Sequence, residues 1–127
     1  MLIVLYELVY VKLIGKGLSC SSKLEVTGDL VYVTTIEDVI QLFDSASGKI
    51  CLVNDAGITT LGPILSDLTG TICTTGGPGS HLAILSREFG IPCIMGTKFN
   101  MDISSVIGMK IKLSHNGDNN GYVHLLD

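Results

Sequence analysis

The chain has 127 residues, a length that suits one domain able to bury a core without disulfides or metal ions. Hydrophobic residues make up 46% of the sequence and charged residues 16%, which excludes intrinsic disorder as the main state. The formal net charge is −4, with only eight Lys and Arg residues, so nothing supplies the basic patch that a nucleic-acid binder needs. We therefore predict a single domain over residues 1–127 that has no nucleic-acid partner.

The first eleven residues, from Met1 to Val11, are strongly apolar but too short to span a bilayer, and Glu7 interrupts them. They lack the basic start and the small-residue cleavage site of a signal peptide. Their β-branched and aromatic residues favour a long strand over residues 2–13. We predict a cytoplasmic protein without a membrane segment, and the edge of this strand offers a pairing site for a partner or a second copy.

The four cysteines are widely spaced, without a Cys-x-x-Cys pair or a histidine at zinc-binding distance. A free cysteine within an apolar run behaves as a small buried hydrophobe. Reduced thiols agree with the cytoplasm. We expect reduced thiols at Cys20, Cys51, Cys73 and Cys93, and burial of the last three, which lie within apolar runs.

In the first half of the chain, small residues over 15–22 predict a loop, and residues 30–34 predict a strand. Thr35 is a candidate helix N-cap because two acidic residues follow it in the first turn. That helix is expected to end near residue 43. A short apolar run at residues 50–53 predicts a buried strand.

In the second half, Thr59 or Thr60 is expected to cap a helix whose first turn tolerates Pro63. Four further strands are predicted at residues 71–74, 92–95, 109–113 and 122–125. The last two form a hairpin around the polar turn at 116–121. The total of about seven strands and three helices predicts an α/β fold with mixed sheets and helices in a compact layered sandwich.

Residues 81–89 have the strongest helical pattern of the chain. Leu82, Leu85 and Phe89 share one face, which predicts the buried side of this helix. Gly90 is expected to end the helix in the left-handed conformation that favours glycine.

The loop before this helix contains the candidate functional residues of the chain. Gly76, Gly77 and Gly79 free the backbone to bend and to approach a ligand closely. The first amide groups of a helix have no internal partner and favour an anion, to which the Ser80 hydroxyl adds a donor or a helix cap. His81 at the loop–helix junction is either a nucleophile for a phosphoryl group or a cap that bonds a nearby carbonyl. The loop matches neither the P-loop nor the dinucleotide fingerprint.

The stretch Gly76-Gly-Pro-Gly-Ser-His-Leu-Ala-Ile84, followed by Ser-Arg-Glu-Phe-Gly-Ile-Pro over residues 86–92 and by Gly96, resembles the phosphohistidine signature of PEP-utilising enzyme mobile domains. These are the swivelling domains of pyruvate phosphate dikinase, PEP synthase, enzyme I and rifampicin phosphotransferase. Looser likeness covers most of residues 12–125, and its segments are Gly15, Gly17, Ser19, 51–53, 60–63 and 108–123.

The resemblance implies a swivelling β/β/α domain that moves between a phosphoryl donor and an acceptor on other domains. It also implies that His81 is the phosphoryl-accepting catalytic residue. The residues that would bind the phosphoryl group are then Gly76, Gly77, Gly79 and Ser80. Two departures stand out: Gly79 replaces a threonine that is frequent in the family, and residues 20–23 replace a glycine-containing segment.

The chain shows no nucleotide-binding loop and no acidic cluster for magnesium. The resemblance therefore implies the phosphotransferase component of a larger PEP-utilising or dikinase-type system, incomplete by itself and without a cofactor of its own. Its expected partner, in cis or as a separate subunit, is an ATP-grasp nucleotide-binding domain or a PEP/pyruvate-binding barrel. Magnesium with ATP or PEP is expected on that partner.

Two other functions stay open at this point. One is a non-catalytic interaction or regulatory module, like the domain of this family appended to some pyruvate kinases. The other is passive binding of a phosphometabolite at the helix start. Arg87 lies on a different face of the helix from His81, which favours a solvated or structural ion pair over a phosphate contact. His115 and His124 are expected to be surface or structural residues.

Overall fold

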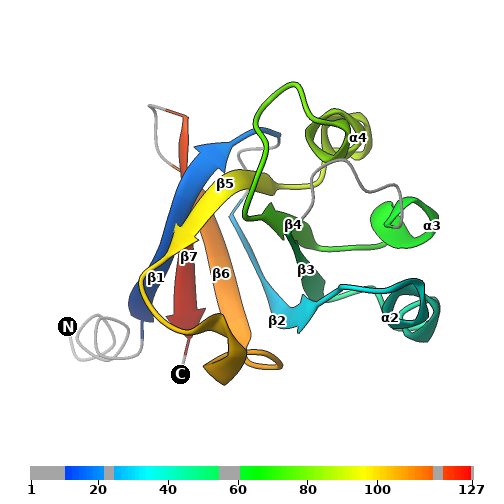
Figure 1. Ribbon diagram of the computed structural model, residues 1–127, viewed down its shortest axis with the longest axis horizontal. Coiled ribbons are helices and arrows are strands. Elements are labelled where there is room, and N and C mark those ends of the chain that lie inside the picture. Colours follow the sequence, from blue (N-terminus) through cyan, green and yellow to red (C-terminus); the bar gives the residue numbers. More distant parts are fainter. Residues whose placement is uncertain (1–10, 22–24, 55–60, 116–118, 127) are drawn as a thin grey trace.

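The computed structural model describes residues 11–21, 25–54, 61–115 and 119–126 (Figure 1). Within this part of the chain there are seven strands and three α-helices, which confirms the predicted number of elements. In chain order they are β1 (Val11–Ser19), β2 (Val26–Tyr32), α2 (Ile36–Gln41), β3 (Lys49–Val53), α3 (Gly62–Leu65), β4 (Gly70–Cys73), α4 (His81–Phe89), β5 (Cys93–Phe99), the 3-10 turn η1 (Ile103–Ser105), β6 (Lys110–His115) and β7 (Asn120–Leu126).

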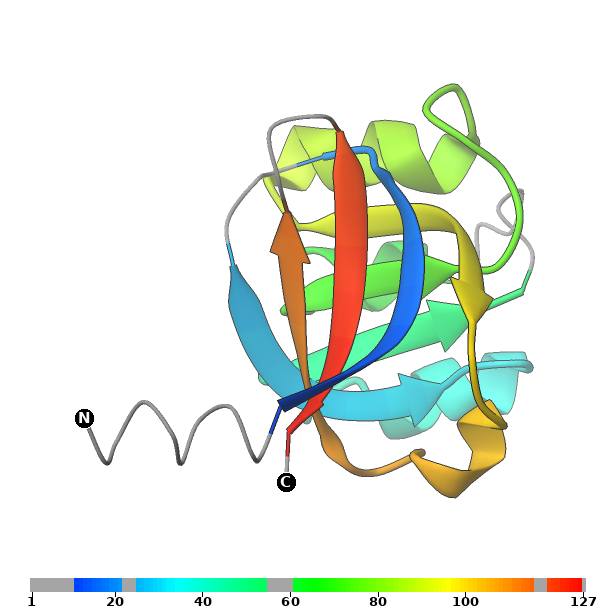
Figure 2. The same cartoon turned by 90° about the vertical axis from the view of Figure 1, so that its left-hand side faces the viewer.

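The strands form one closed barrel in the order β1-β5-β4-β3-β2-β6-β7. Strands β2 to β5 are parallel neighbours, and each of their connections carries a helix, as parallel pairing requires. The three helices lie on one side of the barrel, and the antiparallel strands β1, β6 and β7 form the other (Figures 1 and 2). None of the described helices is long and apolar enough to cross a membrane.

The predicted mixed α/β class is confirmed, but the predicted layered sandwich of sheets is corrected to a single closed sheet. The cause is β1, which pairs with β5 on one edge and with β7 on the other. Residues 2–10 of the predicted first strand lie outside the described residues. In its described part, the expected free edge is occupied by these two neighbours.

Two apolar cores follow from the alternation of side chains along the strands. On β3, Ile50 and Leu52 point into the barrel, whereas Cys51 and Val53 face the helix layer. Every residue of β4 is buried, because one face meets the barrel core and the other meets the helices. The continuous apolar run of β3 predicted that strand correctly. Strand β4 was also predicted, although its Thr71 is a buried polar residue.

The loop predicted over residues 15–22 is wrong, because β1 continues through its glycines to Ser19. A Cβ atom on Gly17 would lie 2.5 Å from the Met95 carbonyl oxygen, and one on Gly15 would lie 2.8 Å from the Phe99 ring. These glycines therefore let β1 lie close against β5. The register of β1 shifts between Lys16 and Leu18 in its pairing with β5, and between Leu13 and Gly15 in its pairing with β7.

The Thr35 cap is confirmed. Its hydroxyl oxygen accepts from the Asp38 amide at 3.3 Å, and the Asp38 carboxylate accepts from the Thr35 amide at 3.1 Å. The helix ends at Gln41 rather than near residue 43. Thr59 and Thr60 lie outside the described residues, and α3 has Leu61 as its N-cap with Pro63 in its first turn.

Candidate functional site

The candidate site lies at the carboxyl ends of the parallel strands β3 and β4, where the chain leaves β4 and enters α4 (Figure 1). Ligands bind in this position in open α/β sheets because the connecting loops converge there. We call residues 74–80 the catalytic loop, for the role that we propose for it. The structure brings all the predicted site residues together in this loop and in the first turn of α4.

Helix α4 spans His81–Phe89, the range that the sequence predicted. Ser80 is its N-cap and accepts from the Ala83 amide at 3.4 Å. The Ser80 hydroxyl donates to the Gly77 carbonyl at 2.8 Å, and the Ser80 amide donates to the same oxygen at 3.0 Å. Of the two predicted roles of Ser80, the structure shows the helix cap. Gly90 ends the helix with a φ of 67°, as expected.

His81 is the first residue of α4, and its side chain is exposed. Because Ser80 provides the cap, the imidazole is not needed for that role. The His81 side chain makes no hydrogen bond or ion pair with any part of the chain that the structure describes. The amides of His81 and Leu82 lie in the first turn, where a helix offers no acceptor. This end of the helix therefore presents a solvent-accessible imidazole beside unpaired donors.

The three predicted glycines do not share one conformation. Gly76 has a φ of 78°, in the left-handed region, so it needs glycine. Gly77 and Gly79 lie outside that region, and a Cβ atom on either would meet no atom within 4 Å. Only Gly76 is thus required by the turn itself. Gly77 and Gly79 leave open space next to the start of α4.

A polar cluster that the sequence did not predict holds the start of the catalytic loop. The Thr75 hydroxyl donates to the Asn54 carbonyl at 2.8 Å, and the Thr74 hydroxyl donates to the Asn54 side-chain oxygen at 2.9 Å. The Asn54 amide nitrogen donates to the Tyr32 hydroxyl. Asn54 comes directly after the buried run of β3, and that position was the signal available in the sequence.

Arg87 contacts the catalytic loop from the last turn of α4. Its guanidinium donates to the Pro78 carbonyl and to the Cys20 carbonyl, each at 2.9 Å. A structural role is confirmed, but the predicted ion pair is corrected, since both partners are backbone oxygens.

The buried face of α4 matches the predicted one in part. Leu82 is buried and Leu85 packs partly buried against the core, as predicted, whereas Phe89 is 50% exposed. Ala83 and Ser86 complete the buried face. Ser86 packs through a pair of buried hydroxyl groups and not through an apolar contact. Its hydroxyl oxygen lies 3.3 Å from the hydroxyl oxygen of Thr71. This pair explains why an apolar-only pattern missed Ser86.

All four cysteines are buried, and none forms a disulfide in the described residues. The predicted burial of Cys51, Cys73 and Cys93 is confirmed. Burial raises the pKa of Cys51 to about 12 and that of Cys93 to about 11. A thiol that stays protonated at neutral pH is a poor nucleophile, so these two cysteines are core residues.

His115 and His124 lie on the β6–β7 hairpin, not in the catalytic loop. His124 is partly buried, and its Nε2 atom lies 3.0 Å from the Ser114 hydroxyl. Burial lowers the pKa of His124, and the positive charge of Lys112 lowers it further. Its position agrees with the predicted structural role.

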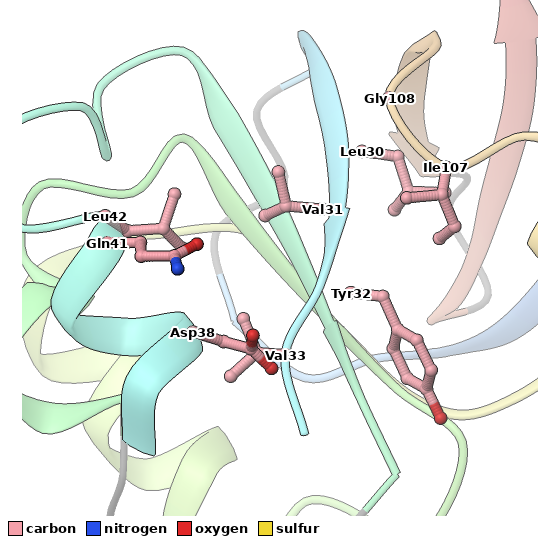
Figure 3. Close-up of a pocket in the computed structure, with 9 residues that line it drawn as sticks. All are labelled: Leu30, Val31, Tyr32, Val33, Asp38, Gln41, Leu42, Ile107 and Gly108. Atoms are coloured by element: carbon pink, nitrogen blue, oxygen red, sulfur yellow. The ribbon is translucent and has the colours of Figure 1, made fainter. Parts of the chain in front are cut away.

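An open pocket of about 250 Å³ lies between β2, α2 and the turn after η1 (Figure 3). It contains none of the predicted site residues. The described residues include no group of three or more His, Cys, Asp or Glu side chains that could hold a metal ion. The pocket is lined by Leu30, Val31, Tyr32, Val33, Asp38, Gln41, Leu42, Ile107 and Gly108.

Comparison with known proteins gives three kinds of likeness. The sequence profile of the family described as PEP-utilising enzyme, mobile domain, matches residues 46–116. The phosphoenolpyruvate synthase of Pyrococcus furiosus is 35% identical over 65 residues, which cover 47% of this chain and 8% of that enzyme. The chain therefore matches only a small part of this curated relative.

Among solved structures, the muramoyltetrapeptide carboxypeptidase from Oxalobacter formigenes aligns with 99% of this chain and 54% of its own. The TM-score is 0.56 at 14% identity, a likeness of fold alone. The N-terminal domain of Enzyme 1 - Nitrogen aligns with 50% of this chain and 26% of its own, with 26% identity and a TM-score of 0.42.

Proposed function

Because the chain belongs to the family of PEP-utilising enzyme mobile domains, we propose that it carries phosphoryl groups on His81. It accepts the group from a donor partner and passes it to an acceptor. The observation that supports this proposal most directly is the exposed, unbonded imidazole at the first residue of α4, directly after the glycine-containing loop. A histidine tied into the core would instead favour a non-catalytic module.

The chemistry follows from the imidazole. In its neutral form, one ring nitrogen uses its lone pair to attack the phosphorus of the donor. A phosphorus–nitrogen bond forms while the phosphorus–oxygen bond to the donor breaks, and the donor leaves as pyruvate or as a shortened nucleotide. Transfer to the acceptor reverses these events with a new nucleophile.

The protein's contribution is positioning and charge stabilisation. The three oxygens of the transferring group carry negative charge, which the amides of the first turn and the helix dipole stabilise. The Ser80 cap keeps this turn formed next to His81. Gly77 and Gly79 leave the space that the phosphoryl group needs.

The donor is an ATP-grasp nucleotide-binding domain or a PEP/pyruvate-binding barrel, in cis or as a separate subunit. Magnesium and the small substrate belong to that partner. The domain swivels as a body between the two sites, a motion that suits a compact fold with its own cores. The likeness to phosphoenolpyruvate synthase supports a partner of this class.

The test is the intact mass of the full chain after incubation with PEP and a barrel partner, or with ATP and an ATP-grasp partner. We expect a phosphate adduct that is lost in acid and is absent from His81→Ala. His115→Ala is the matched control and should keep the adduct. No adduct from either donor on the folded chain would reject phosphoryl transfer and favour the non-catalytic module.

A further inference from the structure

Arg87 joins two segments that are distant in the sequence. One nitrogen of its guanidinium donates to Cys20, just after β1, and the other donates to Pro78, in the middle of the catalytic loop. The planar guanidinium carries donors in a fixed fork, so one side chain can hold both carbonyls in one geometry. A lysine ammonium is a point donor without this fork.

The contact with Pro78 has a consequence for the next residue. The described peptide bonds are trans, so the carbonyl of Pro78 and the amide N–H of Gly79 point in opposite directions. Fixing this carbonyl toward Arg87 directs the Gly79 N–H away from it. In the described structure that N–H has no hydrogen-bond partner. Gly79 lies two residues before His81.

The remaining contacts hold the residues on either side of this peptide. Thr74 and Thr75 hold the beginning of the loop through Asn54. The Ser80 contacts with Gly77 hold its end. The bond from the Ser80 amide to the Gly77 carbonyl closes a turn around the Pro78–Gly79 peptide. The central peptide of such a turn can adopt either of two orientations, and the Arg87 contact with Pro78 selects one of them.

We propose that Arg87 is a positioning residue that fixes the Pro78–Gly79 peptide, so that the Gly79 N–H is a preset donor for the phosphoryl group on His81. The inference rests on the proposed function for its ligand. The conformational part, a loop ordered by Arg87, is independent of it.

The first test measures backbone order by NMR on the full chain. In the wild type, the Gly79 amide should have the order parameter of rigid backbone, about 0.85. In Arg87→Met it should fall below about 0.6, whereas amides of β3 and β4 keep their values. Arg87→Lys should fall between the two. Glu88→Gln, at the neighbouring exposed position, is the matched control and should not change Gly79.

The second test measures how fast His81 is phosphorylated by phosphoramidate, a small donor that needs no partner. Its phosphorus–nitrogen bond breaks, ammonia leaves, and the phosphoryl group bonds to the imidazole. We expect the maximal rate to fall about tenfold or more in Arg87→Met, because a preset donor is lost from the transition state. Glu88→Gln should react at the wild-type rate.

The results of these tests distinguish the role of Arg87 from the carrier function of His81. A wild-type chain that gains phosphate on His81, with equal rates and equal Gly79 order in Arg87→Met, would overturn the role of Arg87 and leave the carrier function standing. A wild-type chain that gains none from phosphoramidate or from a partner would reject the carrier function. In that case the role of Arg87 as a donor-positioning residue is rejected with it.

If Arg87→Met does not fold, an NMR measurement on the wild-type chain still tests the contacts of Arg87. A guanidinium held by two carbonyls rotates slowly, so its two terminal nitrogens should give separate NMR signals at low temperature. A single averaged signal would contradict the proposal.

Discussion

Gly76 and Gly79 lie three residues apart, but only Gly76 has a backbone conformation that favours glycine. Gly76 has a φ of 78°, whereas Gly79 is outside the left-handed region and has open space around it. We predict that Gly76→Ala lowers the unfolding free energy by about 1 kcal/mol, the cost of a left-handed residue with a Cβ atom. Gly79→Ala should leave it unchanged or raise it by about 0.5 kcal/mol, since alanine reduces the entropy of the unfolded chain.

Urea unfolding of the two variants measures this difference. The reverse order, with Gly79→Ala the less stable protein, would show that the loop backbone differs from the one described. Gly79→Ala also tests the departure from the family threonine, because the space at this position accepts a side chain.

His124 gives the fold a pH dependence in a defined window. Its pKa is lowered in the folded state, so the unfolded chain binds the proton first as the pH falls below about 6.5. The unfolding free energy should therefore decrease from pH 7.5 to pH 5.5. The pKa values of Asp29 and Asp38 are also lowered in the folded state. They reduce the unfolding free energy in a separate pH range, below about pH 4.

His124→Gln should remove the loss of stability between pH 7.5 and 5.5. Urea unfolding at three pH values gives the comparison. Equal slopes for the variant and the wild type would mean that another group titrates in this range.

At the scale of the element, α4 depends on its cap. The Ser80 hydroxyl accepts from Ala83 and donates to Gly77, so it connects the helix to the loop. We expect Ser80→Ala to destabilise the protein by about 1 kcal/mol, as for other N-cap substitutions. Ser80→Asn should recover part of this loss, since asparagine is also a good N-cap.

Thermal unfolding of both variants measures the effect. A Ser80→Ala protein as stable as the wild type would exclude the cap as a contributor to helix stability. Thr35→Ala is the matched control, because it removes a cap from α2, far along the chain from the catalytic loop.

The elements also show what sequence patterns can and cannot predict. The limits of helix α4 were predicted to the residue because its N-cap and its final glycine are adjacent to it in the sequence. Strand β1 was partly read as a loop, since its glycines reflect close contact with β5, more than 70 residues away in the sequence. The contacts of Arg87 and Asn54 were missed for the same reason: they depend on the folded path of distant segments.

At the scale of the molecule, the barrel closes where β1 meets β5. Gly17 lies at this junction, and a Cβ atom there would be 2.5 Å from a backbone oxygen and 2.9 Å from an Ile94 methyl group. We predict that Gly17→Ala lowers the unfolding free energy by about 2–3 kcal/mol, the cost of overpacking a rigid site. Gly62→Ala, with open space around its Cβ atom, is the matched control and should change little.

Denaturant unfolding with the slope recorded for each protein is the appropriate measurement. A stable Gly17→Ala chain would mean that β1 and β5 can move apart without opening the barrel.

A carrier must both accept and release its phosphoryl group, so a pulse–chase experiment is the decisive measurement of this function. The full chain is labelled from a donor carrying ³²P, separated from it, and mixed with the second partner and an unlabelled acceptor. We expect acid-labile label on His81 that leaves the chain when the acceptor is added, and no label on His81→Ala. Label that stays on the chain after the acceptor is added would contradict the carrier function. A folded wild-type chain that takes up no label would contradict it as well.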